Sequence, residues 1–392
     1  MAQPIQSPRK DDYLPAATPR IIDLVRERES LPETFTLPNK YVDDGQEGKR
    51  MPAMSKPCNH ISLFLEYTGY GLGGVVNADG NRCDTAYLMA NALRGSAFDG
   101  GCMESLPEAD RRACNLMGLS WEAASMPFID MRDACVRWLL VKGLPCVVTS
   151  LPGLDFGALV VGYEAWGDVL ICYRYSGFYG DNTPSVASVS NWYREGTQLV
   201  RMEPADSALL SDKEGLYRKA LRTGAHMLNA QADTLTAFFD AWVRQLSFMQ
   251  SEALAEIRRT RSLPGSWRQD DAGEFGDYSD DTLLDILDEL VDPLWCDYAE
   301  RRYYAAHLCA QAQTYFPEHK ESLQQAEGCF WRLLGEMDQY INETSHDPVN
   351  REAYWNPEVR GRMAGYVRAC QKLDMEAGAL LAQVAEGLRG KR

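Results

Sequence analysis

Cys58 stands near the start of a stretch, KPCNHISLFLEYTGYG, whose apolar spacing predicts a helix over 58–68. A thiol is mostly protonated at neutral pH, and a helix N-terminus together with an imidazole converts it into a nucleophilic thiolate. The first turn of a helix leaves backbone N–H groups without intrahelical partners, so Cys58 meets the first of these requirements. The sequence therefore offers Cys58 as a candidate nucleophile. The alternative is a small buried side chain at a helix start.

A base for this thiol is harder to find among the five histidines. His60 follows Cys58 by two residues, a spacing that points the two side chains apart on a helix. The other histidines all fall in the C-terminal half of the chain: His226, His307, His319 and His346. His226 and His307 lie in predicted helices, where a packed histidine is the simpler interpretation. The sequence thus supplies a candidate thiol without an identified base.

Two further groups are candidates for contacts with a ligand. Gly71 and Gly73 follow the predicted helix in TGYGLGG. A dinucleotide fingerprint requires a strand before it, so these glycines indicate a helix stop and a loop that lines a cleft. Tyr173 and Tyr175 alternate along a predicted strand and share one of its faces. They form either a ligand-contacting rim or part of the core.

The elements that must position these residues divide the chain. Further helices are predicted over 85–93 and 131–141, and strands within 143–151, 157–164, 168–175 and 197–203. Only helical patterns follow residue 204: 216–228, 230–259, 282–290, 294–314, 321–341 and 361–388. Loops are predicted over 263–281 and 342–357. We expect a flexible leader (1–55), an α+β domain of helices followed by an antiparallel sheet (56–205), and an all-helical domain (206–392).

Composition excludes several classes of partner. The 392 residues include 40 basic and 56 acidic side chains, giving a net charge of −16, which repels nucleic acid. The one basic run, Arg258, Arg259 and Arg261, is interpreted as a solvated helix end. No apolar stretch reaches the roughly 18 residues of a membrane span, and no signal-peptide pattern opens the chain, which favours a cytoplasmic location. The 11 cysteines include no C-x-x-C pair, so we expect reduced thiols, no metal site and no cofactor.

The order of motifs resembles a known superfamily. A helix opening on Cys58, then KGLPCVV, then the hairpin sequence GALVVGYEAWGDVLI, resembles the papain-like cysteine peptidases and acyltransferases. More narrowly, the chain is similar to the butirosin-biosynthesis-protein-H-like group, in which the helix has the form C-x-x-x-S-L-x-x-x-L-x-Y-x-G. The residues from Cys58 to Gly69 come close to that form, and the likeness extends to the C-terminus. The resemblance implies a papain-like domain followed by a helical region.

The resemblance also implies where a base belongs. In papain-like proteins the histidine starts the central strand, six residues before the glycine that corresponds to Gly162, and Phe156 occupies that position. The following strand, 169–174, carries no carboxylate or amide to orient a base. The implied protein is a degenerate, non-catalytic member of the superfamily. Its cleft near Cys58 is expected to bind a small molecule or peptide through Asn59, His60, Gly71, Gly73, Phe156, Tyr173 and Tyr175.

Two other functions stay open. In the first, Cys58 acts in acyl transfer or amide hydrolysis with an atypical base, and the resemblance then implies an acyl carrier protein as a partner. In the second, the protein is an interaction protein that works through its helical half; a broad exposed apolar face there would favour it.

Overall fold

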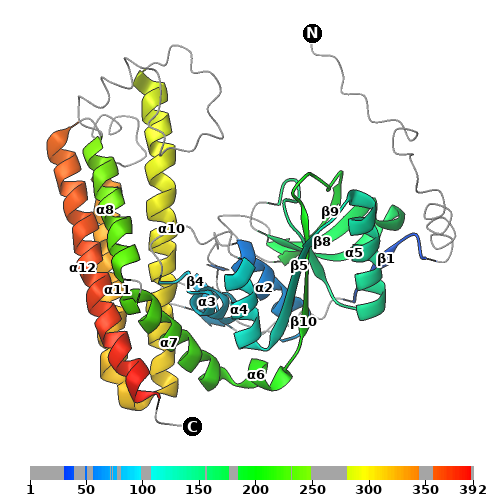
Figure 1. Ribbon diagram of the computed structural model, residues 1–392, viewed down its shortest axis with the longest axis horizontal. Helices are drawn as coiled ribbons and strands as arrows, with labels where there is room; N and C mark the ends of the chain where they lie inside the picture. Colours follow the sequence, from blue (N-terminus) through cyan, green and yellow to red (C-terminus); the bar gives the residue numbers. More distant parts are fainter. Residues whose placement is uncertain are drawn as a thin grey trace.

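The computed structural model describes residues 31–38, 49–50, 56–70, 72, 74–76, 81–98, 107–154, 157–175, 184–230, 232–248, 280–343 and 356–389. Within these ranges the protein is α+β, as the sequence predicted. The strands end at Pro204, and each described element that follows is a helix. Figure 1 shows the sheet at one side, the long helices at the other, and several of the shorter helices of the first half between them.

The larger sheet has seven strands, in the order β5-β10-β6-β7-β8-β9 with β1 also paired to β7. All of its pairings are antiparallel. The strands are β1 (Phe35–Thr36), β5 (Leu119–Ser125), β6 (Cys146–Val148), β7 (Ala158–Glu164), β8 (Val169–Tyr175), β9 (Pro184–Ser190) and β10 (Gln198–Pro204). The predicted strands correspond to β6, β7, β8 and β10, whereas β1, β5 and β9 were not predicted.

β7 is the central strand, and the turn η2 (Ala165–Gly167) joins it to β8 as the predicted hairpin. Its first six residues are buried. Figure 1 shows α2 (Lys56–Tyr67) and α5 (Phe128–Lys142) on opposite sides of this part of the sheet. Because both faces of β7 are covered, its sequence is a continuous apolar run instead of an alternating pattern.

Two shorter helices lie between the sheet and the long helices, α3 (Thr85–Arg94) and α4 (Pro107–Met117). The Asp84 carboxylate caps α3 by accepting hydrogen bonds from the backbone N–H groups of Ala86 and Tyr87. The predicted helices α2, α3 and α5 are confirmed, whereas α4 was not predicted. A second, small sheet consists of β2 (Lys49–Arg50), β4 (Asn81–Asp84) and β3 (Gly74–Val76). Its β2–β4 pair is parallel.

Part of the expected leader belongs to the sheet. β1 pairs with β7, and the Tyr67 hydroxyl of α2 donates a hydrogen bond of 2.9 Å to the carbonyl of Leu37. The Tyr163 hydroxyl of β7 donates one to the carbonyl of Pro32. These backbone hydrogen bonds offset the conformational entropy that a short segment loses when it becomes ordered. Residues 31–38 therefore belong to the fold, whereas their composition predicted a flexible leader. Residues 1–30 lie outside the described ranges.

The second half is helical throughout its described residues. Its elements are α6 (Ser207–Ser211), α7 (Lys213–Ala230), α8 (Ala232–Phe248), α10 (Asp280–Tyr315), η4 (Pro317–His319), α11 (Lys320–Glu343) and α12 (Pro357–Gly387). The prediction of separate helices over 282–290 and 294–314 is wrong, because α10 continues through Pro293. A proline removes one backbone hydrogen bond, which a helix of this length tolerates. The basic run Arg258, Arg259 and Arg261 lies outside the described residues.

The two halves share one core. α3 packs against α7 and α10 as well as against α2. The Tyr87 ring of α3 lies 4.7 Å from that of Tyr304 on α10, and the Tyr87 hydroxyl donates a hydrogen bond of 2.7 Å to the Glu300 carboxylate. The buried apolar side chains of both halves form one continuous cluster. α3 therefore belongs to the packing of both halves.

Candidate functional site

Cys58 lies in the interior. It is 0% exposed, in the first turn of α2. Burial raises the pKa of Tyr87 on α3 and of Cys114 on α4, and a charge on Cys58 would raise both further. Cys58 therefore lies beside groups of α3 and α4. Reactive cysteines are partly exposed and lie in electropositive surroundings, whereas this thiol occupies the position of a packed core residue.

The start of α2 and the start of β7 lie together. Asn59 and His60 are both buried. A Cβ at Gly157, one residue before β7, would lie 3.0 Å from His60 Cδ2 and 3.3 Å from Asn59 Cβ. These distances are shorter than ordinary van der Waals contacts, and φ at Gly157 is +92°, a conformation that favours glycine. Phe156, at the position implied for the base, lies outside the described residues.

Among the remaining predicted site residues, the structure describes the side chain of Tyr173, which lies away from Cys58. Tyr173 is buried and packs edge-on against Tyr67, with ring centroids 5.1 Å apart. Tyr67 ends α2 and lies about 14 Å along the helix axis from Cys58. Tyr173 is therefore a core residue that joins β8 to α2. Gly71 and Gly73 lie outside the described residues, as does the side chain of Tyr175.

A pocket of about 780 Å³ lies elsewhere, between α4, α7 and α12. Its lining includes four permanent cations: Arg112, Lys219, Arg222 and Arg389. His226 and Thr223 of α7 also line it, and within the described part of the chain no carboxylate does. In a chain with a net charge of −16, this local excess of positive charge is the feature of the described structure that most directly points to a ligand.

Two of these cations are held by helix ends. The Arg112 guanidinium donates a hydrogen bond of 2.7 Å to the carbonyl of Arg94, the last residue of α3. The Lys219 ammonium donates one of 2.9 Å to the carbonyl of Leu116, near the end of α4. Carbonyls at a helix C-terminus carry partial negative charge and favour a cation. The packing thus orients both side chains before any ligand arrives.

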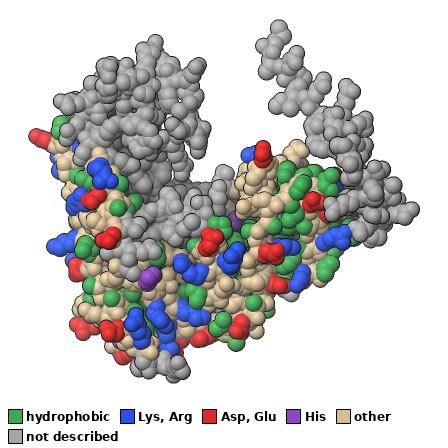
Figure 2. Space-filling view, in the orientation of Figure 1, with side chains coloured by type: hydrophobic (Ala, Val, Ile, Leu, Met, Phe, Trp, Pro, Cys, Tyr) green, Lys and Arg blue, Asp and Glu red, His purple; other side chains and the backbone are tan. Residues whose placement is uncertain are grey.

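The other two cations, Arg222 and Arg389, are exposed at the pocket. None of the salt bridges among the described residues includes Arg112, Lys219, Arg222 or Arg389. Figure 2 shows Lys and Arg side chains gathered where α7 passes the C-terminal end of α12. None of the described carboxylates pairs with these four cations, so the pocket is suited to an anion.

The crossing of α7 and α12 positions the pocket. The Asn229 side-chain amide donates hydrogen bonds of 2.7 Å to the carbonyl of Gly378 and to that of Ala225. A Cβ at Gly378 would lie 2.9 Å from Leu228 Cβ, so the glycine allows the two helices to touch. Figure 1 shows α7 crossing α12 at an angle and leading away toward α6. The small side chains of Ala382 and Ala385 then leave room between the helices.

Some of the basic residues of this pocket can be recognised from the sequence. Lys219, Arg222 and His226 recur at intervals of three and four residues and therefore share one face of a helix. Their spacing identifies a basic stripe on α7. The sequence prediction did not include this stripe, because its residues are not contiguous as those of the basic run near residue 260 are. Arg112 and Arg389 lie far away in the sequence. Only the tertiary structure brings them to that stripe.

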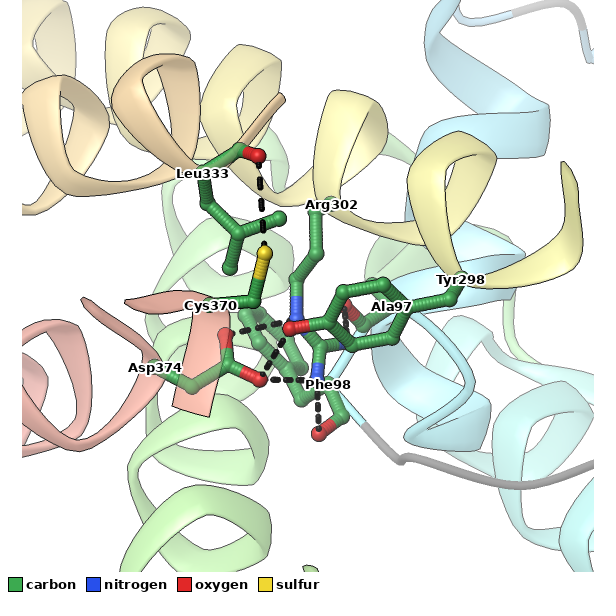
Figure 3. Close-up of polar contacts among 7 residues, drawn as sticks. All are labelled: Ala97, Phe98, Tyr298, Arg302, Leu333, Cys370 and Asp374. Carbon is green, nitrogen blue, oxygen red and sulfur yellow. Dashed lines mark hydrogen bonds and ion pairs between the residues drawn. The ribbon is translucent and has the colours of Figure 1, made fainter. Parts of the chain in front are cut away.

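A second charged cluster is fully internal, and Figure 3 shows its contacts. Arg302 of α10 and Asp374 of α12 both have side chains that are 0% exposed. Arg302 Nε and Nη2 donate to the two Asp374 oxygens at 2.7 and 2.6 Å, and its Nη1 and Nη2 donate to the carbonyls of Ala97 and Phe98. The Tyr298 hydroxyl also donates to Asp374. Each charge has partners of opposite sign, so this cluster joins the halves of the molecule and is not a binding site.

Other kinds of site receive no support from the residues that the structure describes. Among them, no group of three or more His, Cys, Asp and Glu side chains is arranged to hold a metal ion. None of the helices in this part of the chain combines the length and apolar character that crossing a membrane requires. Comparison of the chain with protein-family models, with curated proteins and with solved structures finds no match.

Proposed function

We propose that the protein binds an anionic small molecule in the pocket between α4, α7 and α12, and that it does so without covalent catalysis. One observation carries this proposal: four permanent cations face a volume of about 780 Å³, and none of the described residues that line it carries a carboxylate. Mutual repulsion makes such a cluster unfavourable in the empty protein. A bound anion removes the repulsion and accepts charge-assisted hydrogen bonds, each worth roughly 1.5–3 kcal/mol.

The arginines specify the kind of anion. A guanidinium presents its donors in a planar fork that fits the paired oxygens of phosphate or carboxylate groups. Arg112 and Lys219 are fixed by helix-terminal carbonyls, whereas Arg222 and Arg389 make no hydrogen bond through their side chains to the rest of the described protein. The first pair thus supplies a fixed positive field, and the second pair has its donors available for the ligand.

We also propose that the scaffold is a degenerate papain-like one. The helix that opens on Cys58 lies against the start of the central strand, at Gly157, which supports this relationship. The burial of Cys58 supports a packing role for the thiol in place of a nucleophilic one. The acyl-transfer alternative, and with it the acyl carrier protein partner, then becomes unnecessary.

Calorimetric titration with inorganic pyrophosphate tests the anion site. We expect one molecule to bind per chain, and Arg222→Gln/Arg389→Gln to weaken the affinity at least 100-fold, because two charge-assisted contacts are lost. The matched control is Arg111→Gln/Arg244→Gln, which removes the same charge from exposed arginines outside the pocket. Equal affinities of the two double variants, or no binding to the unaltered protein, would refute the proposal.

Thiol labelling tests the role of Cys58 separately. At neutral pH, iodoacetamide followed by peptide mapping is expected to leave Cys58 unlabelled in the folded protein and to label it after denaturation. Cys58→Ser is expected to bind pyrophosphate as the unaltered chain does. Rapid labelling of Cys58 in the folded protein, together with an esterase activity that Cys58→Ser abolishes, would instead establish the enzyme.

A further inference from the structure

We infer that the ligand of this pocket is an amphiphilic phosphate, with a phosphate group held by Arg222 and Arg389 and an apolar chain lying along α12. This inference rests on the proposed function, because it specifies the chemistry of the anion that the same pocket binds. Three observations carry it: the division of the pocket into apolar and cationic parts, the number of cations, and the volume.

The apolar part lies near the helix crossing. Beyond the contact between Gly378 and Asn229, α12 presents Ala382 and then Ala385 to the pocket. Met227 of α7 adds an apolar wall, whereas Leu116 of α4 lies at the boundary between the two parts, because its carbonyl accepts the hydrogen bond from Lys219. Met227 and Ala385 are themselves buried, so this part of the pocket is continuous with the protein core. Such a surface favours hydrocarbon over a hydrated ion.

The cationic part lies further along the same helices. Arg389 lies two residues after the end of α12 at Gly387, and Gly387 is about 13 Å along the helix from Gly378, at the rise of an α-helix. On α7, Lys219 and Arg222 lie two to three turns before Asn229, the residue at the crossing. Arg222 and Arg389, the two cations with available donors, therefore lie away from the crossing, and the small apolar side chains of α12 lie nearer to it. A ligand that satisfies both parts has a charged end and an apolar end.

The charge favours phosphate over carboxylate. Three guanidinium groups and one ammonium group surround the pocket, and its described lining contains no carboxylate. A phosphate monoester carries a charge between −1.5 and −2 at neutral pH and presents three acceptor oxygens. A carboxylate carries one charge and two oxygens, and it would leave more of these donors without an acceptor. Arg-rich sites are accordingly common where phosphate is recognised.

The volume excludes an inorganic ion as a complete occupant. Pockets for organic ligands typically measure roughly 300–1,000 Å³, and this one, at about 780 Å³, lies well inside that range. A phosphate ion fills a minor fraction of such a space and leaves the walls around Ala382 and Met227 exposed to water. An alkyl chain that covers these walls gains roughly fourfold in affinity for each buried methylene.

Titration of the full-length protein with a homologous series tests this inference. The probes are inorganic phosphate, then methyl, butyl, hexyl and octyl phosphate, with octanoate as the carboxylate of matched chain length. We expect affinity to rise at least 30-fold from methyl to octyl phosphate, and octanoate to bind at least tenfold more weakly than octyl phosphate. Ala382→Phe, which fills the apolar part, is expected to remove the dependence on chain length while inorganic pyrophosphate still binds.

The outcomes separate this inference from the proposed function. If pyrophosphate binds but affinity is flat along the alkyl series, the apolar subsite is refuted and anion binding stands. If octanoate binds as tightly as octyl phosphate, the phosphate class is refuted. If no anion binds, both proposals fail. Thermal unfolding of Ala382→Phe verifies that this variant is folded, and the series on the unaltered protein does not depend on it.

A vesicle assay then identifies the source of the phosphate ester. Phosphatidylcholine vesicles containing phosphatidic acid present the same chemistry in a membrane. Protein that sediments with these vesicles, and not with pure phosphatidylcholine, takes its phosphate from a lipid headgroup. Protein that binds octyl phosphate but stays in the supernatant takes a soluble ester. Both results support the amphiphilic phosphate, whereas binding to neither probe contradicts it.

Discussion

Arginines occupy two contrasting environments in this molecule. Arg302 is completely buried, and the Asp374 carboxylate and two backbone carbonyls accept hydrogen bonds from its guanidinium (Figure 3). Arg222 and Arg389 lie at a pocket, and no salt bridge of the described structure includes them. Burying a charge is tolerable only when its partners are in place, whereas a charge kept at the surface retains its hydration.

The comparison shows how to separate structural charges from functional ones in a chain of unknown activity. A charge whose donors are all used by the protein has no donors left for a ligand. Removing it therefore changes stability. Other charged side chains lie at a pocket, and the described protein offers no acceptor to their donors. Such a side chain contributes little to stability and is available for binding. The following variants measure this difference.

The largest effect is expected at the buried pair. Arg302→Met leaves the Asp374 carboxylate buried with fewer partners, which should lower the free energy of unfolding by about 3–5 kcal/mol. Urea denaturation measures it. The control is Arg332→Met, whose partner Glu376 is also exposed, and it should cost less than about 1 kcal/mol. Equal losses for the two variants would show that burial does not distinguish them.

The helix crossing comes next. Gly378→Ala places a Cβ 2.9 Å from Leu228 Cβ, so α7 and α12 must separate, at a cost of about 1–3 kcal/mol. The affinity for pyrophosphate should fall as well, because the crossing shapes the pocket. Gly365→Ala on the same helix meets no atom within 4 Å and should be stabilising by about 0.5–1 kcal/mol. A Gly378→Ala protein as stable as Gly365→Ala would contradict this explanation of the crossing.

A smaller effect on the free energy of unfolding is expected at His307, a buried side chain. Burial lowers the pKa of His307, whose ring lies 4.4 Å from that of Tyr303, and none of the described residues hydrogen-bonds its Nε2. The folded state therefore favours the neutral form. The stabilisation is complete above the ordinary histidine pKa of about 6.5 and is lost as pH falls through the lower folded value. His307→Phe should flatten the dependence of the unfolding free energy on pH between 7 and 5. An unchanged slope would show that this pH dependence comes from other groups.

The smallest effect on stability is expected at the pocket itself. In the absence of ligand, Arg222→Gln/Arg389→Gln should change the free energy of unfolding by no more than about 0.5 kcal/mol, because the variant breaks no salt bridge. Urea denaturation compares this double variant with Arg302→Met. A loss of several kcal/mol would mean that the pocket arginines are structural, and the contrast with Arg302 would then disappear.

Local patterns were sufficient for much of the fold. The helix that starts near Cys58, the hairpin of β7 and β8, and the change to helices after Pro204 follow from periodicity and turn residues that are contiguous in the sequence. The sequence prediction ended one helix at residue 290 and began another at 294, whereas α10 continues through Pro293. β5 and β9 were not predicted, because their sequences, LSWEAAS and PSVASVS, lack a strong apolar run.

The candidate site depended on contacts that no local pattern contains. The resemblance directed attention to Cys58, and the structure brings His60 and Gly157 together there, but it buries the thiol. The pocket instead combines residues of α4, α7 and α12, whose approach depends on Gly378 fitting against Leu228. A composition dominated by acidic residues concealed the local basic cluster. Net charge describes the average surface and does not exclude a site of opposite sign.

Arginine modification mapped by mass spectrometry tests the location of the anion site most directly. The protein is treated with phenylglyoxal in the presence and absence of pyrophosphate, and the modification rate of each arginine is compared. We expect pyrophosphate to slow the modification of Arg222 and Arg389 at least fivefold, and to leave unchanged that of Arg111, an exposed neighbour of the pocket residue Arg112. Equal rates with and without pyrophosphate at Arg222 and Arg389 would contradict an anion site between α4, α7 and α12.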